Sequence, residues 1–121
     1  MSPDGSLHRE LRRNRSLHYS IYGLCAFAAL ARCGEAIGED LWRYRTEDGR
    51  GMERGFDFLA PYLAGEKEWT WENIDDGITV MAIPLMRRAA TVYGSPELSS
   101  ASRRLSAQRP LTEWMAWLTS V

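Results

Sequence analysis

The sequence predicts an all-α fold built from antiparallel helical hairpins. Several segments repeat apolar residues at alternating spacings of three and four, which is the period of an amphipathic helix. Glycine and proline residues stand between these segments and supply the turns. No segment combines the alternation of a strand with a plausible hairpin partner, so no sheet is expected.

The first and longest helix is expected over residues 16–37. Its apolar positions lie on one side of the helix, and they are Leu17, Ile21, Leu24, Ala28 and Ala31. Gly38 would end it. Cys25 and Cys33 fall inside this helix and are about 12 Å apart at the rise of an α-helix, which is too far for a disulfide. We expect both to be small buried residues.

The second helix follows a loop over residues 39–51. Its apolar positions are Met52, Phe56, Leu59 and Leu63. Pro61 should bend or end the helix, which closes near Gly65. Trp69 and Trp71 lie in the loop that comes next, where packing in the core or loop is favoured over stacking against sugar rings.

The last part of the chain is expected to add three more helices. The apolar positions of the third are Ile78, Met81, Leu85, Ala89 and Val92. Pro84 should kink this helix, and Gly94 should end it. The fourth runs through Leu98, Ala101 and Leu105. The fifth begins at Pro110, with one face formed by Leu111, Trp114, Met115 and Leu118.

Composition favours one globular domain and excludes some partners. Hydrophobic residues make up 45% of the 121 positions, which is enough for a core. The formal net charge of −1 offers no overall polycation, so we expect no nucleic acid or membrane partner. The polar opening residues show no signal peptide, and no apolar run has the length of a membrane span.

The segment before the first helix is nevertheless locally basic. It holds four arginines against the single acid Glu10, and these arginines are Arg9, Arg12, Arg13 and Arg15. A polyanionic ligand would be drawn to such a segment. The alternative is a solvated surface with no ligand.

Four residues with acid, base or cationic side chains share one face of the first helix. With Arg15 at zero and about 100° per residue, His18 lies at about 300°, Tyr19 at about 40° and Tyr22 at about 340°. The aliphatic stripe lies on the opposite side. One guanidinium, one imidazole and two phenols that point the same way form a candidate acid–base cluster.

Such a cluster suits β-elimination next to a carboxylate. That reaction needs a cation to offset charge on the carboxylate, a base for the adjacent proton and an acid for the leaving oxygen. Arg15 can supply the first, and Tyr or His side chains the others. The structural alternative is that these side chains are partly buried with one satisfied hydrogen bond each.

Several blocks of the sequence resemble the alginate lyase family and the wider group of helical-toroid polysaccharide lyases. The blocks are Asp4-Gly5-Ser6, the run from Arg15 to Tyr22 with Glu10, Arg13 and Leu24 around it, Gly38 to Trp42, Tyr44, Asp48 to Arg50 and Asp57 to Leu63. The likeness is strongest over residues 4–94. Residues 95–121 would form terminal helices of the same partial domain.

The resemblance implies catalytic roles for Arg15 and Tyr22, with His18 and Tyr19 binding substrate. It implies an incomplete (α/α) toroid, an acidic polysaccharide substrate such as alginate, and a periplasmic or secreted enzyme. No residue pattern in the sequence indicates a cofactor or a metal site. The family also uses an Asn followed by a His on an earlier helix, and residues 1–14 do not match that pair. We therefore expect a C-terminal portion with little activity alone and with some exposed apolar surface.

Two other functions remain open from sequence. A non-catalytic helical module would use the same basic, aromatic face to bind acidic glycans or a partner protein. A nucleic-acid-binding helical protein would use residues 8–18 as a phosphate-contacting stripe, which the near-neutral net charge disfavours.

Overall fold

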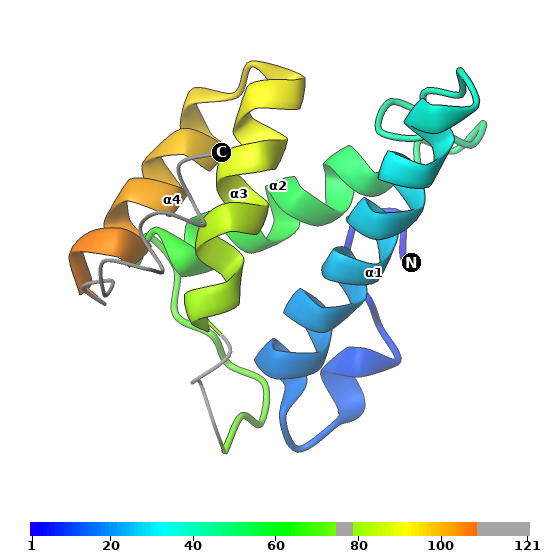
Figure 1. The fold of residues 1–121 in the computed structure, drawn as a ribbon. Helices are drawn as coiled ribbons and strands as arrows, with labels where there is room; N and C mark the ends of the chain where they lie inside the picture. Colours follow the sequence, from blue (N-terminus) through cyan, green and yellow to red (C-terminus); the bar gives the residue numbers. More distant parts are fainter. Residues whose placement is uncertain (75–78, 109–121) are drawn as a thin grey trace.

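The computed structural model describes residues 1–74 and 79–108, and these form helices without strands, which confirms the all-α prediction. The elements are η1 (Glu10–Arg12, a 3₁₀ helix), α1 (Ser16–Ala36), α2 (Met52–Leu63), α3 (Thr79–Tyr93) and α4 (Pro96–Gln108) (Figure 1). The predicted fifth helix and Ile78 lie outside the described residues.

Helices α3 and α4 form an antiparallel hairpin joined by a short turn, as expected from sequence (Figure 1). Helix α2 contacts α1, α3 and α4, so it holds the two sides of the molecule together. Helix α1 also contacts α3 and packs closely against η1. The residues before α1 therefore belong to the same packed unit as the helices.

The core lies where the apolar faces of the helices meet, and the predicted stripes of α1, α2 and α4 are confirmed. All but one of their predicted positions are buried, and the buried ones are Leu17, Ile21, Leu24, Ala31, Met52, Phe56, Leu59, Leu63, Leu98, Ala101 and Leu105. Ala28 is half-buried and packs against them. Burial of these faces removes apolar surface from water and is the main force that holds the helices together.

Two predictions about buried residues were wrong. Met81 is 50% exposed, whereas Ala82, Ile83 and Met86 are fully buried. Helix α3 contacts three other helices, so its buried face is wider than one stripe and is turned away from Met81. Cys33 is exposed because the buried side of the last turns of α1 is formed by Ala31 and Gly34 instead.

Three aromatic residues from different elements meet at the centre of the core. Phe56 is fully buried, with its ring centroid 6.4 Å from that of Trp42 and 6.1 Å from that of Tyr93. The Tyr93 hydroxyl donates a hydrogen bond of 2.7 Å to the carbonyl of Trp42, and burial raises the pKa of this tyrosine above its usual range. These contacts attach the loop before α2 to the end of α3.

The N-terminal turn packs directly on the backbone of α2. Gly5 has φ +93°, and a Cβ at this position would lie 2.0 Å from the carbonyl oxygen of Arg54. Asp4 accepts a hydrogen bond of 2.9 Å from the backbone N–H of Ser6, and that bond lowers the pKa of its carboxyl. Packing therefore explains the Asp4-Gly5-Ser6 block, because the backbone at Gly5 approaches the backbone of α2 too closely for a side chain at this position.

Candidate functional site

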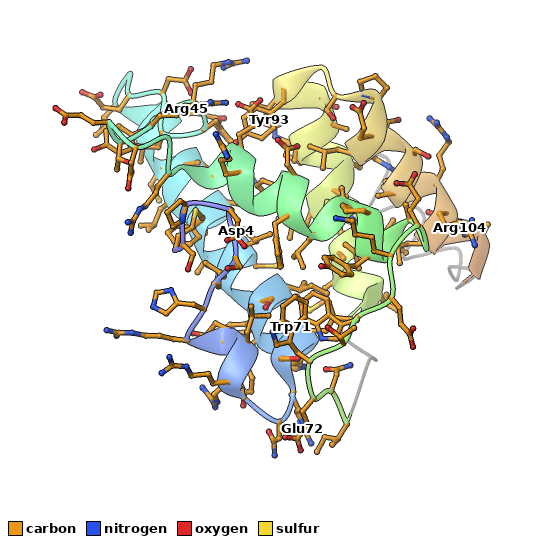
Figure 2. All side chains as sticks on the ribbon, turned by 180° about the vertical axis from the view of Figure 1, so that it is seen from behind. Asp4, Arg45, Trp71, Glu72, Tyr93 and Arg104 are labelled. Atoms are coloured by element: carbon orange, nitrogen blue, oxygen red, sulfur yellow. The ribbon has the colours of Figure 1, made fainter. Side chains whose placement is uncertain are left out.

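The beginning of α1 is held by residues 72–74, which come from a distant part of the sequence. The backbone N–H of Ser16 donates to the carbonyl of Glu72 at 3.1 Å, and the N–H of Leu17 donates to Oδ1 of Asn73 at 3.2 Å. The N–H of Ile74 donates back to the carbonyl of Asn14 at 3.0 Å. The first N–H groups of a helix lack partners inside the helix, so this segment acts as its cap (Figure 2).

We expect Asn73→Ala to destabilise the protein by about 1 kcal/mol, the usual cost of losing an N-terminal cap. The free energy of unfolding measured in urea checks this value. Asn14→Ala is the matched control, because Asn14 is exposed and contributes its backbone carbonyl to the same contact. Equal effects of the two substitutions would contradict a capping role for the Asn73 side chain.

An aromatic cluster lies beside this cap and consists of Phe58, Tyr62, Trp69 and Trp71. The ring centroids of Trp69 and Trp71 are 4.9 Å apart, and that of Tyr62 is 5.1 Å from Trp69. Nε1 of Trp69 donates a hydrogen bond of 2.9 Å to Oγ of the buried Ser16. Trp69 packs against the core, which confirms the predicted packing role for this residue. Trp71 lies near the first turn of α1 (Figure 2).

The structure brings three of the four predicted site residues into contact. The His18 ring meets Tyr19 edge-on with centroids 5.1 Å apart, and it stacks nearly parallel to Tyr22 at 6.3 Å. Tyr22 is 60% exposed, whereas His18 and Tyr19 are half-buried. A phenol open to solvent beside a stacked imidazole is accessible to a ligand.

Arg15 has a different position from the one that helical geometry predicts. It is the residue before the first turn of α1, with φ −119° and ψ 56°, and its backbone forms an isolated antiparallel bridge with Asn73. The step of about 100° per residue therefore does not apply to its side chain. Arg15 is exposed, and its guanidinium has no hydrogen bond or ion pair with any other described residue.

Sequence reasoning missed one contact of this cluster. The Cζ atom of Arg13 lies 3.8 Å from the centroid of the Tyr19 ring. The sequence places Arg13 in the basic segment, but a helical wheel cannot include it because Arg13 precedes α1 and lies in the turn that joins η1 to this helix. In addition, Nδ1 of His18 is buried and has no hydrogen-bond partner among the described residues.

Three further arginines belong to the loop before α2 and have acidic partners. Each forms an ion pair on the surface of the loop before α2 or at its start. Arg43 pairs with Asp40 at 2.9 Å, Arg45 with Glu53 at 2.7 Å and Arg50 with Asp48 at 2.7 Å.

An acidic cavity of about 370 Å³ lies away from the predicted site and is lined by Asp57, Glu66 and Glu97. Burial, followed by repulsion from Glu53 and Glu97, raises the pKa of Asp57. A raised pKa means that the folded state holds this proton more tightly than the unfolded state does. The contribution of Asp57 to stability therefore falls as the pH rises from the usual Asp range through the raised value.

We expect Asp57→Asn to raise the midpoint of thermal unfolding at neutral pH, because it removes the disfavoured charge. The difference should disappear as the pH is lowered through the usual Asp range. Asp48→Asn is the control, and it should lower the midpoint at neutral pH, since hydrogen bonds from Thr46 and Arg50 lower the pKa of Asp48 and favour its charged form. A midpoint for Asp57→Asn that is unchanged at every pH would contradict the expected effect.

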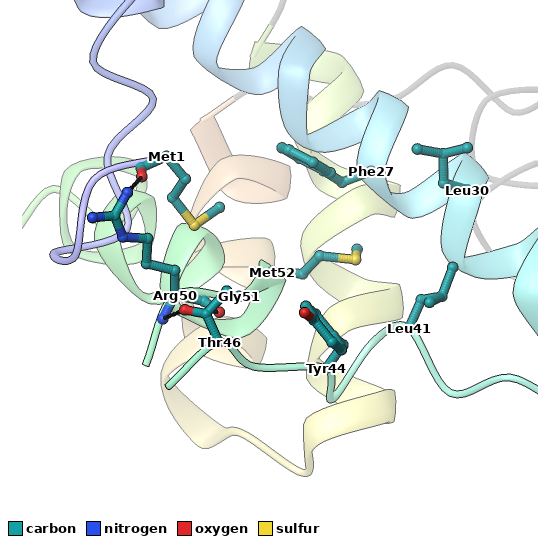
Figure 3. Close-up of a pocket in the computed structure, with 9 residues that line it drawn as sticks. All are labelled: Met1, Phe27, Leu30, Leu41, Tyr44, Thr46, Arg50, Gly51 and Met52. Atoms are coloured by element: carbon teal, nitrogen blue, oxygen red, sulfur yellow. Dashed lines mark hydrogen bonds between the residues drawn. The ribbon is translucent and has the colours of Figure 1, made fainter. Parts of the chain in front are cut away.

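An apolar cavity of about 380 Å³ opens farther along α1. Phe27 and Leu30 of α1 face Leu41, Tyr44 and Met52 across it (Figure 3). Leu30 is 59% exposed and Tyr44 62% exposed, so the expectation of exposed apolar surface is confirmed here. The lining is mostly apolar, and its polar side chains are those of Tyr44, Thr46 and Arg50, of which Arg50 is already paired with Asp48.

Within residues 1–74 and 79–108, no helix is long and apolar enough to cross a membrane. No group of three or more His, Cys, Asp or Glu side chains in that part of the chain is placed to hold a metal ion.

Comparison with known proteins agrees with the sequence blocks and with the fold. The crystal structure of an alginate lyase from Bacteroides ovatus superposes with a TM-score of 0.77 at 23% sequence identity. The match covers 93% of the present chain and 30% of that lyase, so the present chain spans less than a third of it. The comparison with curated proteins found no match. The model of the family described as alginate lyase matches residues 1–69, which is more than half of the sequence, and the chain therefore belongs to the alginate lyase family.

Proposed function

We propose that this chain carries part of the catalytic site of a polysaccharide lyase that cleaves an alginate-like uronate polymer by β-elimination. The observation that carries the proposal is the exposed Tyr22 phenol stacked on His18, on the helix that begins directly after Arg15. Family membership supports the class of reaction. The proposed architecture is a portion of an (α/α) toroid, and the proposed location of the enzyme is the periplasm or the extracellular space.

Each predicted residue has a role in this proposal. The reaction removes the proton on the carbon next to the uronate carboxylate, and the electrons of that bond form a carbon–carbon double bond. The bond from the next carbon to the glycosidic oxygen breaks, and the leaving oxygen takes up a proton. Arg15 offsets the charge that develops on the carboxylate, and Tyr22 serves as the acid, and also as a base. His18 and Tyr19 contact the sugar.

The remainder of the site is proposed to come from residues outside this sequence. The alginate lyase family pairs an Asn and a His with the Arg and Tyr, and residues 1–14 contain no match to that pair. The match to only 30% of the Bacteroides ovatus enzyme is consistent with a composite site. We therefore expect little or no lyase activity from residues 1–121 alone, and unsaturated uronate formed by the purified chain would contradict this expectation.

The proposal is tested in a chimera in which this chain replaces the matching 30% of the Bacteroides ovatus lyase. Formation of unsaturated uronate from alginate is followed by ultraviolet absorbance, and binding of alginate is measured separately. Loss of product with retained binding in Tyr22→Phe supports a catalytic role for this residue. Product formation by Tyr22→Phe at the rate of the unsubstituted chimera would exclude that role.

The second candidate is a non-catalytic module that binds acidic glycans through the same face. The observation in its favour is the limited span of the chain relative to the lyase it resembles. In this case alginate binds to residues 1–121, whereas the chimera stays inactive with either Tyr or Phe at position 22. The same two measurements therefore separate the candidates.

A further inference from the structure

The four side chains Arg13, Tyr19, His18 and Tyr22 form a continuous row, which we call the Arg13–Tyr22 row. The Arg13 guanidinium lies over the Tyr19 ring at 3.8 Å, Tyr19 meets His18 at 5.1 Å, and His18 stacks on Tyr22 at 6.3 Å. The row connects Tyr22, the residue proposed as acid and base, to the guanidinium of Arg13, which precedes α1. Arg13 is therefore part of the same surface as Tyr22.

The turn between η1 and α1 sets the position of Arg13. Its backbone N–H donates to the carbonyl of Glu10 at 3.0 Å, and its extended backbone, with φ −83° and ψ 154°, turns the chain out of η1. Helix η1 itself packs on α1. These contacts and the Tyr19 ring restrict the guanidinium, so binding a ligand would cost less side-chain entropy than it does for a free surface arginine.

The N–H groups of Arg13 remain available. Its Nη1 atom is 3.8 Å from Oε2 of Glu10, which is too long for a hydrogen bond, and the side chain is 51% exposed. No other described residue accepts a hydrogen bond from this guanidinium. A guanidinium that stacks on an aromatic ring uses its face and keeps its donors in the plane.

Donors arranged in this way match a carboxylate, which accepts two parallel hydrogen bonds from one guanidinium. The local charge favours the same ligand, because residues 9–15 contain four arginines, Arg9, Arg12, Arg13 and Arg15, and the single acid Glu10. A polymer of uronates presents one carboxylate on every sugar. Arg13 and Arg15 are both exposed and lie two residues apart in the chain, so these two cations suit the carboxylates of two successive units of the polymer.

We propose that Arg13 binds the carboxylate of the uronate unit adjacent to the one that Arg15 and Tyr22 act on. The identity of the ligand rests on the proposed function. Tyr19 serves as a positioning residue that holds the Arg13 guanidinium in place. A neutral sugar at this position would lose the paired hydrogen bonds, so Arg13 selects for polymers with consecutive carboxylates.

The test measures the affinity of residues 1–121 for a tetramer of mannuronate by isothermal titration calorimetry. We expect Arg13→Gln to raise Kd by about tenfold, which corresponds to about 1.4 kcal/mol. Arg12→Gln is the matched control, because it removes the same charge from an exposed neighbour, and it should change Kd by no more than about twofold. Arg13→Lys keeps the charge but loses the paired donors, so its Kd should also rise.

Each outcome separates this inference from the proposed function. Equal effects of Arg13→Gln and Arg12→Gln, or wild-type affinity in Arg13→Lys, would overturn the role of Arg13. If Arg15→Gln weakens binding in that case, the proposed function stands without Arg13. Failure of the wild-type chain to prefer the mannuronate tetramer over a neutral mannose tetramer would overturn both. Arg13→Met keeps the stacked stem without the donors, and thermal unfolding of every variant verifies that the fold is intact.

Discussion

Replacing Tyr22 by Phe is expected to lower the rate of elimination in the chimera by about 10²-fold to 10⁴-fold, the range that a positioned acid or base contributes. The substitution removes one hydroxyl and keeps the ring that stacks on His18. Tyr22 is 60% exposed, so the change leaves the core and the stability of the fold almost untouched. A steady-state assay of unsaturated uronate formation gives the rate, and alginate affinity should change little.

Tyr44→Phe is the matched control for this prediction. Tyr44 is another exposed tyrosine, at 62%, and it lines the apolar cavity rather than the predicted site. Its hydroxyl should be dispensable for turnover. Equal loss of activity in both variants would show that the effect of Tyr22→Phe is not specific, and the catalytic assignment of Tyr22 would then fail.

Phe56→Ala is expected to destabilise the fold by about 3 to 5 kcal/mol, the usual range for truncation of a buried aromatic residue. Phe56 is fully buried and its ring contacts both Trp42 and Tyr93. The cavity left behind would remove the contacts of Phe56 with the Trp42 and Tyr93 rings, and only the direct contact between those two residues would still join the loop before α2 to the end of α3. Because small domains have a total stability of about 5 to 15 kcal/mol, this single change removes a large share of it.

Denaturant unfolding followed by tryptophan fluorescence measures this loss, since Trp42 lies next to the new cavity. Tyr44→Ala is the control, because it truncates an exposed aromatic residue of the same loop and should change the free energy of unfolding by about 0.5 kcal/mol or less. Similar values for Phe56→Ala and Tyr44→Ala would mean that the loop before α2 does not depend on the aromatic core.

The sequence was sufficient to predict the buried positions of those helices that pack on the core with only one face. In α1, α2 and α4 a single apolar stripe faces the core, and residues such as Ile21, Phe56 and Leu98 are buried as their spacing predicts. Helix α3 has neighbours on several sides, and no one-dimensional period describes such an environment. Met81 was therefore placed in the core although it is half exposed.

The candidate site was predictable where it depends on local helix geometry. His18, Tyr19 and Tyr22 are close in the helix and do come together. The Arg13 contact with Tyr19 crosses a turn, and the angle of that turn cannot be derived from residue spacing. The capping role of Asn73 depends on a tertiary contact, and nothing near Ser16 in the sequence indicates it.

The cap on α1 has a consequence for the order of folding. The groups that fix the first turn of this helix lie 56 positions farther along the sequence than the residues they bind. A contact between residues so far apart in the sequence forms only after a long loop has closed. Helical turns form much faster, because they join residues that are neighbours in the sequence. The middle of α1 can therefore exist early, but Arg15 reaches its final backbone conformation only once residues 72–74 have docked. A peptide limited to the family blocks up to residue 63 would contain the sequences of α1 and α2, but the start of α1, and with it the site, would be undefined.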